Sequence, residues 1–151
     1  MQIREGIKDA MENEKLQDEG LKGNEYIEDA ILALQQNATP ELLAHTLTVI
    51  RRRMKEGGQF IVDVEPSVSG TGVNLKVVET ADGAKWWTVF TSFEEELKGA
   101  DSVKSTFLTD MERLFEAALS VPELQGIIVN PWNRTIALDK HLIRIIKPEN
   151  G

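Results

Sequence analysis

Residues 86–99, WWTVFTSFEEELKG, come closest in residue type to catalytic chemistry. The first half alternates as a strand does and the second half favours a helix, so the chain is predicted to turn at Thr91-Ser92. A serine at such a corner resembles the nucleophile elbow of hydrolases, where small glycines flank the serine. Here the neighbouring positions hold Phe90 and Phe93. The residue types therefore argue against a strained catalytic turn.

A helix cap accounts for the same corner. Ser92 is predicted to be the N-cap, and Glu95 is spaced to reach back and complete a capping box. The acidic run that includes Glu94 and Glu96 suits the positive end of the helix dipole. We therefore interpret the corner as structural.

The remaining chemical groups assemble no catalytic or metal pattern. The two histidines, His45 and His141, fall on predicted helices, and no pattern brings either of them to Ser92 as a base. Asp139 and His141 are too close along a helix to form a relay with Lys140, because such neighbours do not face one another. Carboxylates are scattered and cysteine is absent. The sequence predicts no catalytic residue, no metal ligand and no cofactor site.

The sequence favours a binding surface over a catalytic site. Asn130 precedes a proline and is predicted to begin a turn in which Trp132 covers the end of the sheet. In the pair Trp86-Trp87 strand alternation points one ring outward, which is a hint of a binding face. The candidate surface comprises Trp86, Thr91, Ser92, Asn130 and Trp132.

Composition and charge limit the classes of partner that the protein is expected to bind. The chain has 151 residues, a mass of 16.9 kDa, a formal net charge of −8 and a pI near 4.8. Such a charge repels nucleic acid at long range, and the basic run at residues 51–53 is interpreted as a solvated helix end. No apolar run is long enough for a membrane helix. These observations predict a cytoplasmic protein with no nucleic-acid or membrane partner.

The hydrophobic pattern predicts one α+β domain. Helices are expected near residues 24–36 and 40–56, with Asn24 and Thr39 as their N-caps, followed by three strands between residues 59 and 91. A long helix at 105–120, two short strands between 126 and 138, and a last helix capped by Asp139 complete the order ααβββαββα. The long helix is marked by a stripe of Phe107, Leu108, Met111, Leu114, Phe115, Ala118 and Leu119. About five strands are expected in a mixed or mostly antiparallel sheet covered by helices.

The N-terminal part is predicted to stand apart. Residues 1–23 are rich in both signs of charge, and Ile3, Ile7 and Met11 recur at a spacing of four. This pattern predicts a flexible or helical arm that docks on another surface, with a possible role in homo-oligomer formation. The domain itself is expected to span residues 24–151.

The sequence resembles the N-terminal domain of the SseB family, the enhanced serine sensitivity group. The matching segments are TVFTSFEEEL at 88–97, the segment 105–120 followed by VPEL, and GIIVNPWNRTIAL at 126–138. The likeness covers about residues 24–147. It implies a small bacterial α+β domain without established catalytic residues, in which the VFTS and VNPW positions mark the fold.

Two functions remain open from the sequence. The first is a non-catalytic binding or interaction module of the bacterial cytoplasm, for instance one that neutralises a basic partner protein. The second is a sensor or enzyme for an amino-acid-related small molecule, using a cleft near Asn130 and Trp132. Its support is the family's association with serine sensitivity.

Overall fold

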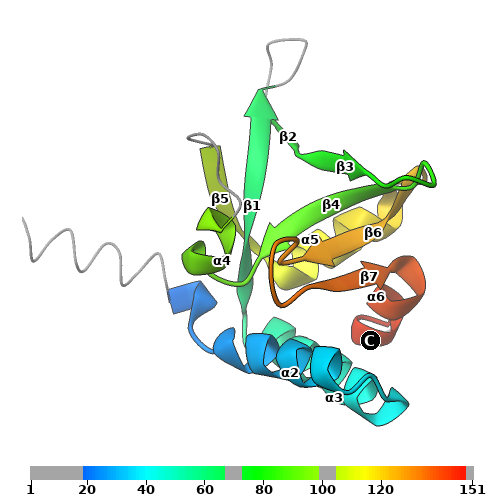
Figure 1. Cartoon of the computed structure of the whole chain (residues 1–151). Coiled ribbons are helices and arrows are strands. Elements are labelled where there is room, and N and C mark those ends of the chain that lie inside the picture. The colour runs from blue at the N-terminus through cyan, green and yellow to red at the C-terminus, as the bar shows by residue number, and fades with distance from the viewer. Residues whose placement is uncertain (1–18, 67–72, 99–104, 149–151) are drawn as a thin grey trace, which may run out of the picture.

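The computed structural model describes residues 19–66, 73–98 and 105–148. The elements follow in the order η1 (Glu19–Leu21), α2 (Glu25–Gln36), α3 (Pro40–Lys55), β1 (Gln59–Pro66), β2 (Val73–Leu75), β3 (Val77–Glu79), β4 (Lys85–Phe90), α4 (Phe93–Leu97), β5 (Ser105–Asp110), α5 (Met111–Ser120), β6 (Leu124–Val129), β7 (Ile136–Asp139) and α6 (Lys140–Ile146). Figure 1 shows α2 and α3 as an antiparallel pair beneath the sheet. Residues 1–18 of the predicted arm lie outside the described residues, whereas 19–23 lead directly into α2.

Local capping sets several of these helices where the sequence predicts them. The Thr39 hydroxyl accepts a hydrogen bond from the Leu42 N–H at 3.1 Å, directly before Pro40. Asp139 caps α6 in the same way through the Leu142 N–H at 2.9 Å. Asn24 holds the predicted N-cap position of α2, but its backbone is already helical and its side chain makes no cap bond. That side chain is used elsewhere.

The sheet is mixed and mostly antiparallel, as predicted. Ile61 in β1 pairs with Phe90 of β4 and with Leu108 of β5, so these strands flank β1 on its two sides. β4 and β6 run parallel, and β7 returns antiparallel to β6. Short β2 and β3 pair with the outer parts of β1 and β4. Seven strands are described in place of about five, because the predicted strand near 73–80 is divided between β2 and β3 and residues 105–110 form β5.

The predicted helix at 105–120 begins later than expected. Residues 105–110 pair with β1 over six positions, and Phe107 is 55% exposed while Leu108 is half-buried. A strand beside β1 satisfies backbone groups that an early helix turn would leave open. From Met111 onward the helix is present, and the stripe of Met111, Leu114, Phe115 and Ala118 is buried as predicted.

The main core lies between the sheet and helices α2, α3, α5 and α6. Phe60 of β1 meets Phe115 of α5 edge to face, with ring centroids 6.1 Å apart. A smaller cluster of Leu21, Ile61 and Phe90 covers part of the opposite face of the sheet. Gly126 permits the close approach of β6 and β7, since a Cβ there would lie 2.1 Å from the Leu138 carbonyl oxygen.

Candidate functional site

Two of the predicted surface residues meet inside the protein. Thr91 and Asn130 follow the ends of the parallel strands β4 and β6, whose register pairs Val89 with Val129. The Thr91 N–H donates to Asn130 Oδ1 at 2.9 Å, and Asn130 Nδ2 donates to Thr91 Oγ1 at 3.0 Å. Both residues are fully buried. Their side chains therefore join two strand ends and face no solvent.

A second layer of polar groups fixes this pair to α2. The Thr91 hydroxyl donates to Glu28 Oε2 at 2.5 Å, and Glu28 Oε1 lies 3.2 Å from Arg134 Nη1. Asn24 Nδ2 donates to the Thr91 carbonyl at 3.0 Å and to that of Gln59 at 2.8 Å. The Asn24 amide is buried here because it satisfies these carbonyls.

Arg53 extends the network to α3. Its Nε donates to Asn24 Oδ1 at 3.0 Å, Nη2 donates to the Gly20 carbonyl at 3.0 Å, and Nη1 pairs with Glu56 at 3.1 Å. The interpretation of residues 51–53 as a solvated helix end is therefore wrong for Arg53, which is 8% exposed. We call Asn24, Glu28, Arg53, Thr91, Asn130 and Arg134 the polar clasp.

The turn between β6 and β7 has an unusual backbone. Asn130 and Arg134 have φ angles of 53° and 50°, in the left-handed region. Asparagine tolerates that conformation, whereas it costs an arginine about 1–2 kcal/mol. The Thr135 hydroxyl donates to the Asn130 carbonyl at 2.5 Å, and Arg134 gains its ion pair with Glu28. These contacts hold the turn in place.

The predicted cap at Ser92 is present, but the expected capping box with the Glu95 side chain is not formed. Ser92 Oγ accepts from the Glu95 N–H at 3.2 Å. The Glu95 carboxylate is buried, and its Oε1 contacts Lys98 Nζ at 3.0 Å and Asn133 Nδ2 at 3.3 Å. It thereby holds α4 to the β6–β7 turn. The corner at residues 91–93 is thus a cap joined to the clasp.

The two predicted tryptophans lie at opposite ends of the parallel strand pair. Trp86 stands near the start of β4, in register with Gly126, whereas Trp132 follows the end of β6. Trp132 is 53% exposed, but Trp86 and Trp87 are both half-buried, so neither is the exposed ring that alternation suggested. The five predicted residues therefore do not form one surface.

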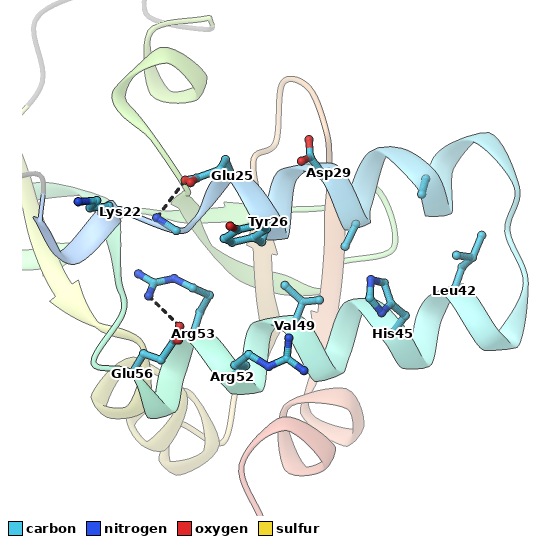
Figure 2. Close-up of a pocket in the computed structure, with 13 residues that line it drawn as sticks. Lys22, Glu25, Tyr26, Asp29, Leu42, His45, Val49, Arg52, Arg53 and Glu56 are labelled. Atoms are coloured by element: carbon cyan, nitrogen blue, oxygen red, sulfur yellow. Dashed lines mark hydrogen bonds and ion pairs between the residues drawn. The ribbon is translucent and has the colours of Figure 1, made fainter.

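An exposed groove lies between α2 and α3 (Figure 2), and Arg53 of the polar clasp lines one end of it. Its volume is about 750 Å³, within the range of ligand-binding clefts. The apolar lining consists of Ala30, Ala33, Leu42 and Val49. Tyr26 is 65% exposed and reaches over this floor from α2.

The rims of this α2–α3 groove carry opposite charges. Glu25 and Asp29 lie on the α2 side, while Arg52 lies on the α3 side, where Arg53 and Glu56 pair with each other. Lys22 and the adjoining Gly23 form the end where the chain enters α2. A molecule bound here meets an apolar floor between an acidic and a basic edge.

Sequence reasoning singled out Thr91 and Asn130 but missed the rest of the polar clasp network and the α2–α3 groove. Arg53 follows Val49 by four positions and Ile50 by three, which places it on the apolar stripe of α3 and is the signal of its burial. Glu28 and Arg134 are 106 positions apart, and a single sequence holds no sign that they meet. The exposure of Tyr26 depends on how α2 packs against α3.

No metal site is apparent within residues 19–66, 73–98 and 105–148: no three His, Cys, Asp or Glu side chains gather there. In the same ranges, no helix is long and apolar enough to cross a membrane. Comparisons with known proteins give no match, whether with family models, curated proteins or solved structures.

Proposed function

We propose that the protein is a non-catalytic binding module of the bacterial cytoplasm, and that its α2–α3 groove holds a helical segment of another protein. The observation that carries this proposal is the apolar floor between Tyr26 and Val49, open on the outside of the helix pair. An exposed tyrosine beside an apolar floor is typical of sites where a few aromatic contacts dominate binding.

The backbone of the site favours a helix as the occupant. An extended peptide binds best along a sheet edge, where free N–H and C=O groups pair with it. Both walls of this groove are α-helices, whose interior backbone groups are already bonded within each helix. A helix satisfies its own backbone and presents only side chains, which matches what α2 and α3 offer.

The charges define the chemistry of that helix. Glu25 and Asp29 favour Lys or Arg on the flank that faces α2, and Arg52 disfavours basic residues on the flank that faces α3. The net charge of −8 also raises the association rate of a basic partner. The expected partner segment has an apolar stripe with basic residues along one flank. Masking of a basic partner protein is one form of this function.

A small-molecule function near Asn130 gains no comparable support. Both side-chain atoms of Asn130 bind Thr91, and its carbonyl accepts from Thr135. The groups expected to contact an amino-acid ligand are therefore occupied by the protein. The buried clasp is better explained as a fixed joint between strand ends and helices.

The resemblance to the SseB N-terminal domain stays a proposal. It is supported by the contact between its two motifs: VFTS contributes Thr91 and VNPW contributes Asn130. Each motif needs the other to satisfy buried polar groups, which gives a physical reason for the two to occur together.

A displayed library of 16-residue peptides, selected on the immobilised full-length protein, tests the function. We expect enriched sequences with apolar residues at helical spacing and Lys or Arg on one flank. Ala33→Glu places a charge on the groove floor and should weaken such peptides at least tenfold. Ala44→Glu is the matched control, because Ala44 is exposed on α3 and outside this groove. Equal binding to the two variants, or no enrichment, would show that the proposed function is wrong.

A further inference from the structure

The α2–α3 groove begins where the chain leaves its first 18 residues. Lys22 and Gly23 line one end of the groove. The segment just before them is fixed to the domain, because Leu21 packs with Ile61 and Phe90 and the Gly20 carbonyl binds Arg53. Residues 1–18 are therefore tethered at that end of the groove.

The sequence of these residues has the chemistry that the groove requires. In a helix, Ile3, Ile7 and Met11 form an apolar stripe. Arg4, Lys8 and Lys15 are spaced by four and seven positions, so they share one flank of this stripe. The opposite flank carries the uncharged residues Gln2, Gly6 and Asn13, and Glu14 ends the stripe.

The handedness of an α-helix decides which flank faces which rim. When the apolar stripe lies on the groove floor, a helix running parallel to α2 turns its basic flank toward Glu25 and Asp29. A helix running antiparallel to α2 turns the same flank toward α3 and Arg52. The rim charges therefore select the parallel direction.

The tether excludes that direction within one chain when the helix includes Lys15, the last residue of the basic flank. A segment running parallel to α2 ends at the far end of the groove, about 18 Å from the start of α2, since α2 has 12 residues. If the helix extends through Lys15, residues 16–18 have to span the return, and an extended link of that length reaches only about 13 Å. A segment from a second copy has no such restriction.

We propose that residues 1–18 of one copy bind in the α2–α3 groove of a second copy as a helix parallel to α2, with reciprocal exchange that gives a two-fold dimer. This inference rests on the proposed function, because it takes the groove as a site for a helix with one basic flank. It names a second copy of the chain as a partner.

Paramagnetic labelling of the full-length protein tests the exchange. The chain has no cysteine, so Glu12→Cys gives a single nitroxide site, on the side of the segment away from the stripe. The nitroxide-labelled protein, at natural isotope abundance, is mixed with ¹⁵N-labelled chains that carry no nitroxide. We expect loss of amide signal at Ala33 and Leu42 and none at Ala117 of α5. Glu5→Cys should move the loss to Tyr26, because a parallel helix places its N-terminal part there.

Broadening that occurs only when the nitroxide and ¹⁵N are in the same chain would overturn the inference in favour of self-docking, and no broadening in either sample would overturn docking itself. Ala33→Glu in the ¹⁵N chain should abolish the signal loss, and Ala44→Glu should keep it. Selected peptides that bind the groove without intermolecular broadening would leave the proposed function standing and this inference wrong.

Swapping the charges of Lys8 and Asp29 provides a second test on the same full-length protein. Lys8→Glu should weaken the dimer at least tenfold in sedimentation analysis, because it places a carboxylate opposite Asp29. Combining Lys8→Glu with Asp29→Lys should restore the association. Failure of the restored pair, with both variants folded, would contradict the parallel placement.

Discussion

The polar clasp and the α2–α3 groove share one residue, Arg53, and differ in most other physical respects. In the clasp, Thr91 and Asn130 are fully buried and hydrogen-bonded to each other. In the groove, Tyr26 is 65% exposed above an apolar floor. The clasp contains the residues that sequence patterns single out, and the groove contains residues with no motif. The comparison teaches that the most distinctive sequence in this chain builds the fold, while the surface suited to binding is made of ordinary helix residues.

Asn130→Ala should have the largest effect on stability, because it breaks the clasp at its centre. The buried Thr91 N–H loses its acceptor, and an alanine has to adopt the left-handed backbone. Together these effects should lower the free energy of unfolding by about 2–5 kcal/mol, measured by urea titration. Asn130→Gly should recover only the backbone part. Peptide binding to the groove should stay within twofold of wild type, and a wild-type unfolding midpoint would contradict the role given to the clasp.

Glu28→Gln should have the next largest effect. It retains one oxygen for the Thr91 hydroxyl but removes the charge that pairs with Arg134. The expected loss is about 1.5–3 kcal/mol, typical of a hydrogen bond to a charged group. Glu25→Gln, on the exposed side of the same helix, is the control and should change stability little. Equal stability of the two variants would show that the ion pair adds nothing to the clasp.

The success of sequence reasoning follows the range of the interactions. The caps at Thr39, Ser92 and Asp139 were predictable because each joins an oxygen to an N–H three positions later. Residues 105–110 fit a helical stripe locally, yet their pairing with β1, about 45 positions earlier, decides that they form a strand. Helix propensity is a weak preference that such tertiary contacts override.

The candidate site shows the same division. Thr91 and Asn130 were identified as matching motif positions, but their contact across 39 residues was not. A single sequence does not reveal this contact, so it cannot distinguish a buried pair of polar residues from an exposed one. The groove was missed because it depends on the relative placement of α2 and α3, and neither helix contains an unusual residue pattern on that face.

Ser92→Ala should have a smaller effect on stability than either clasp variant. It removes the acceptor for the Glu95 N–H at the start of a five-residue helix. A lost cap costs about 0.5–2 kcal/mol, which thermal melts can resolve. Ser92→Thr keeps a hydroxyl acceptor and should be close to wild type. A loss of peptide binding with unchanged melting would instead assign Ser92 to a functional surface.

Tyr26→Ala should have the smallest effect on stability and the largest on binding. The Tyr26 side chain is mostly exposed, so its removal should change the free energy of unfolding by less than about 0.5 kcal/mol. In the groove the same ring would become buried against the bound helix, and its loss should weaken selected peptides at least tenfold, or about 1.4 kcal/mol. Leu32→Ala is the matched control, because Leu32 is 39% exposed on α2 but does not line the groove. Fluorescence titration of a labelled peptide compares the two. If Leu32→Ala weakens binding as much as Tyr26→Ala does, the binding face lies elsewhere on α2. The assignment of binding to the α2–α3 groove is then wrong, whatever the role of the clasp.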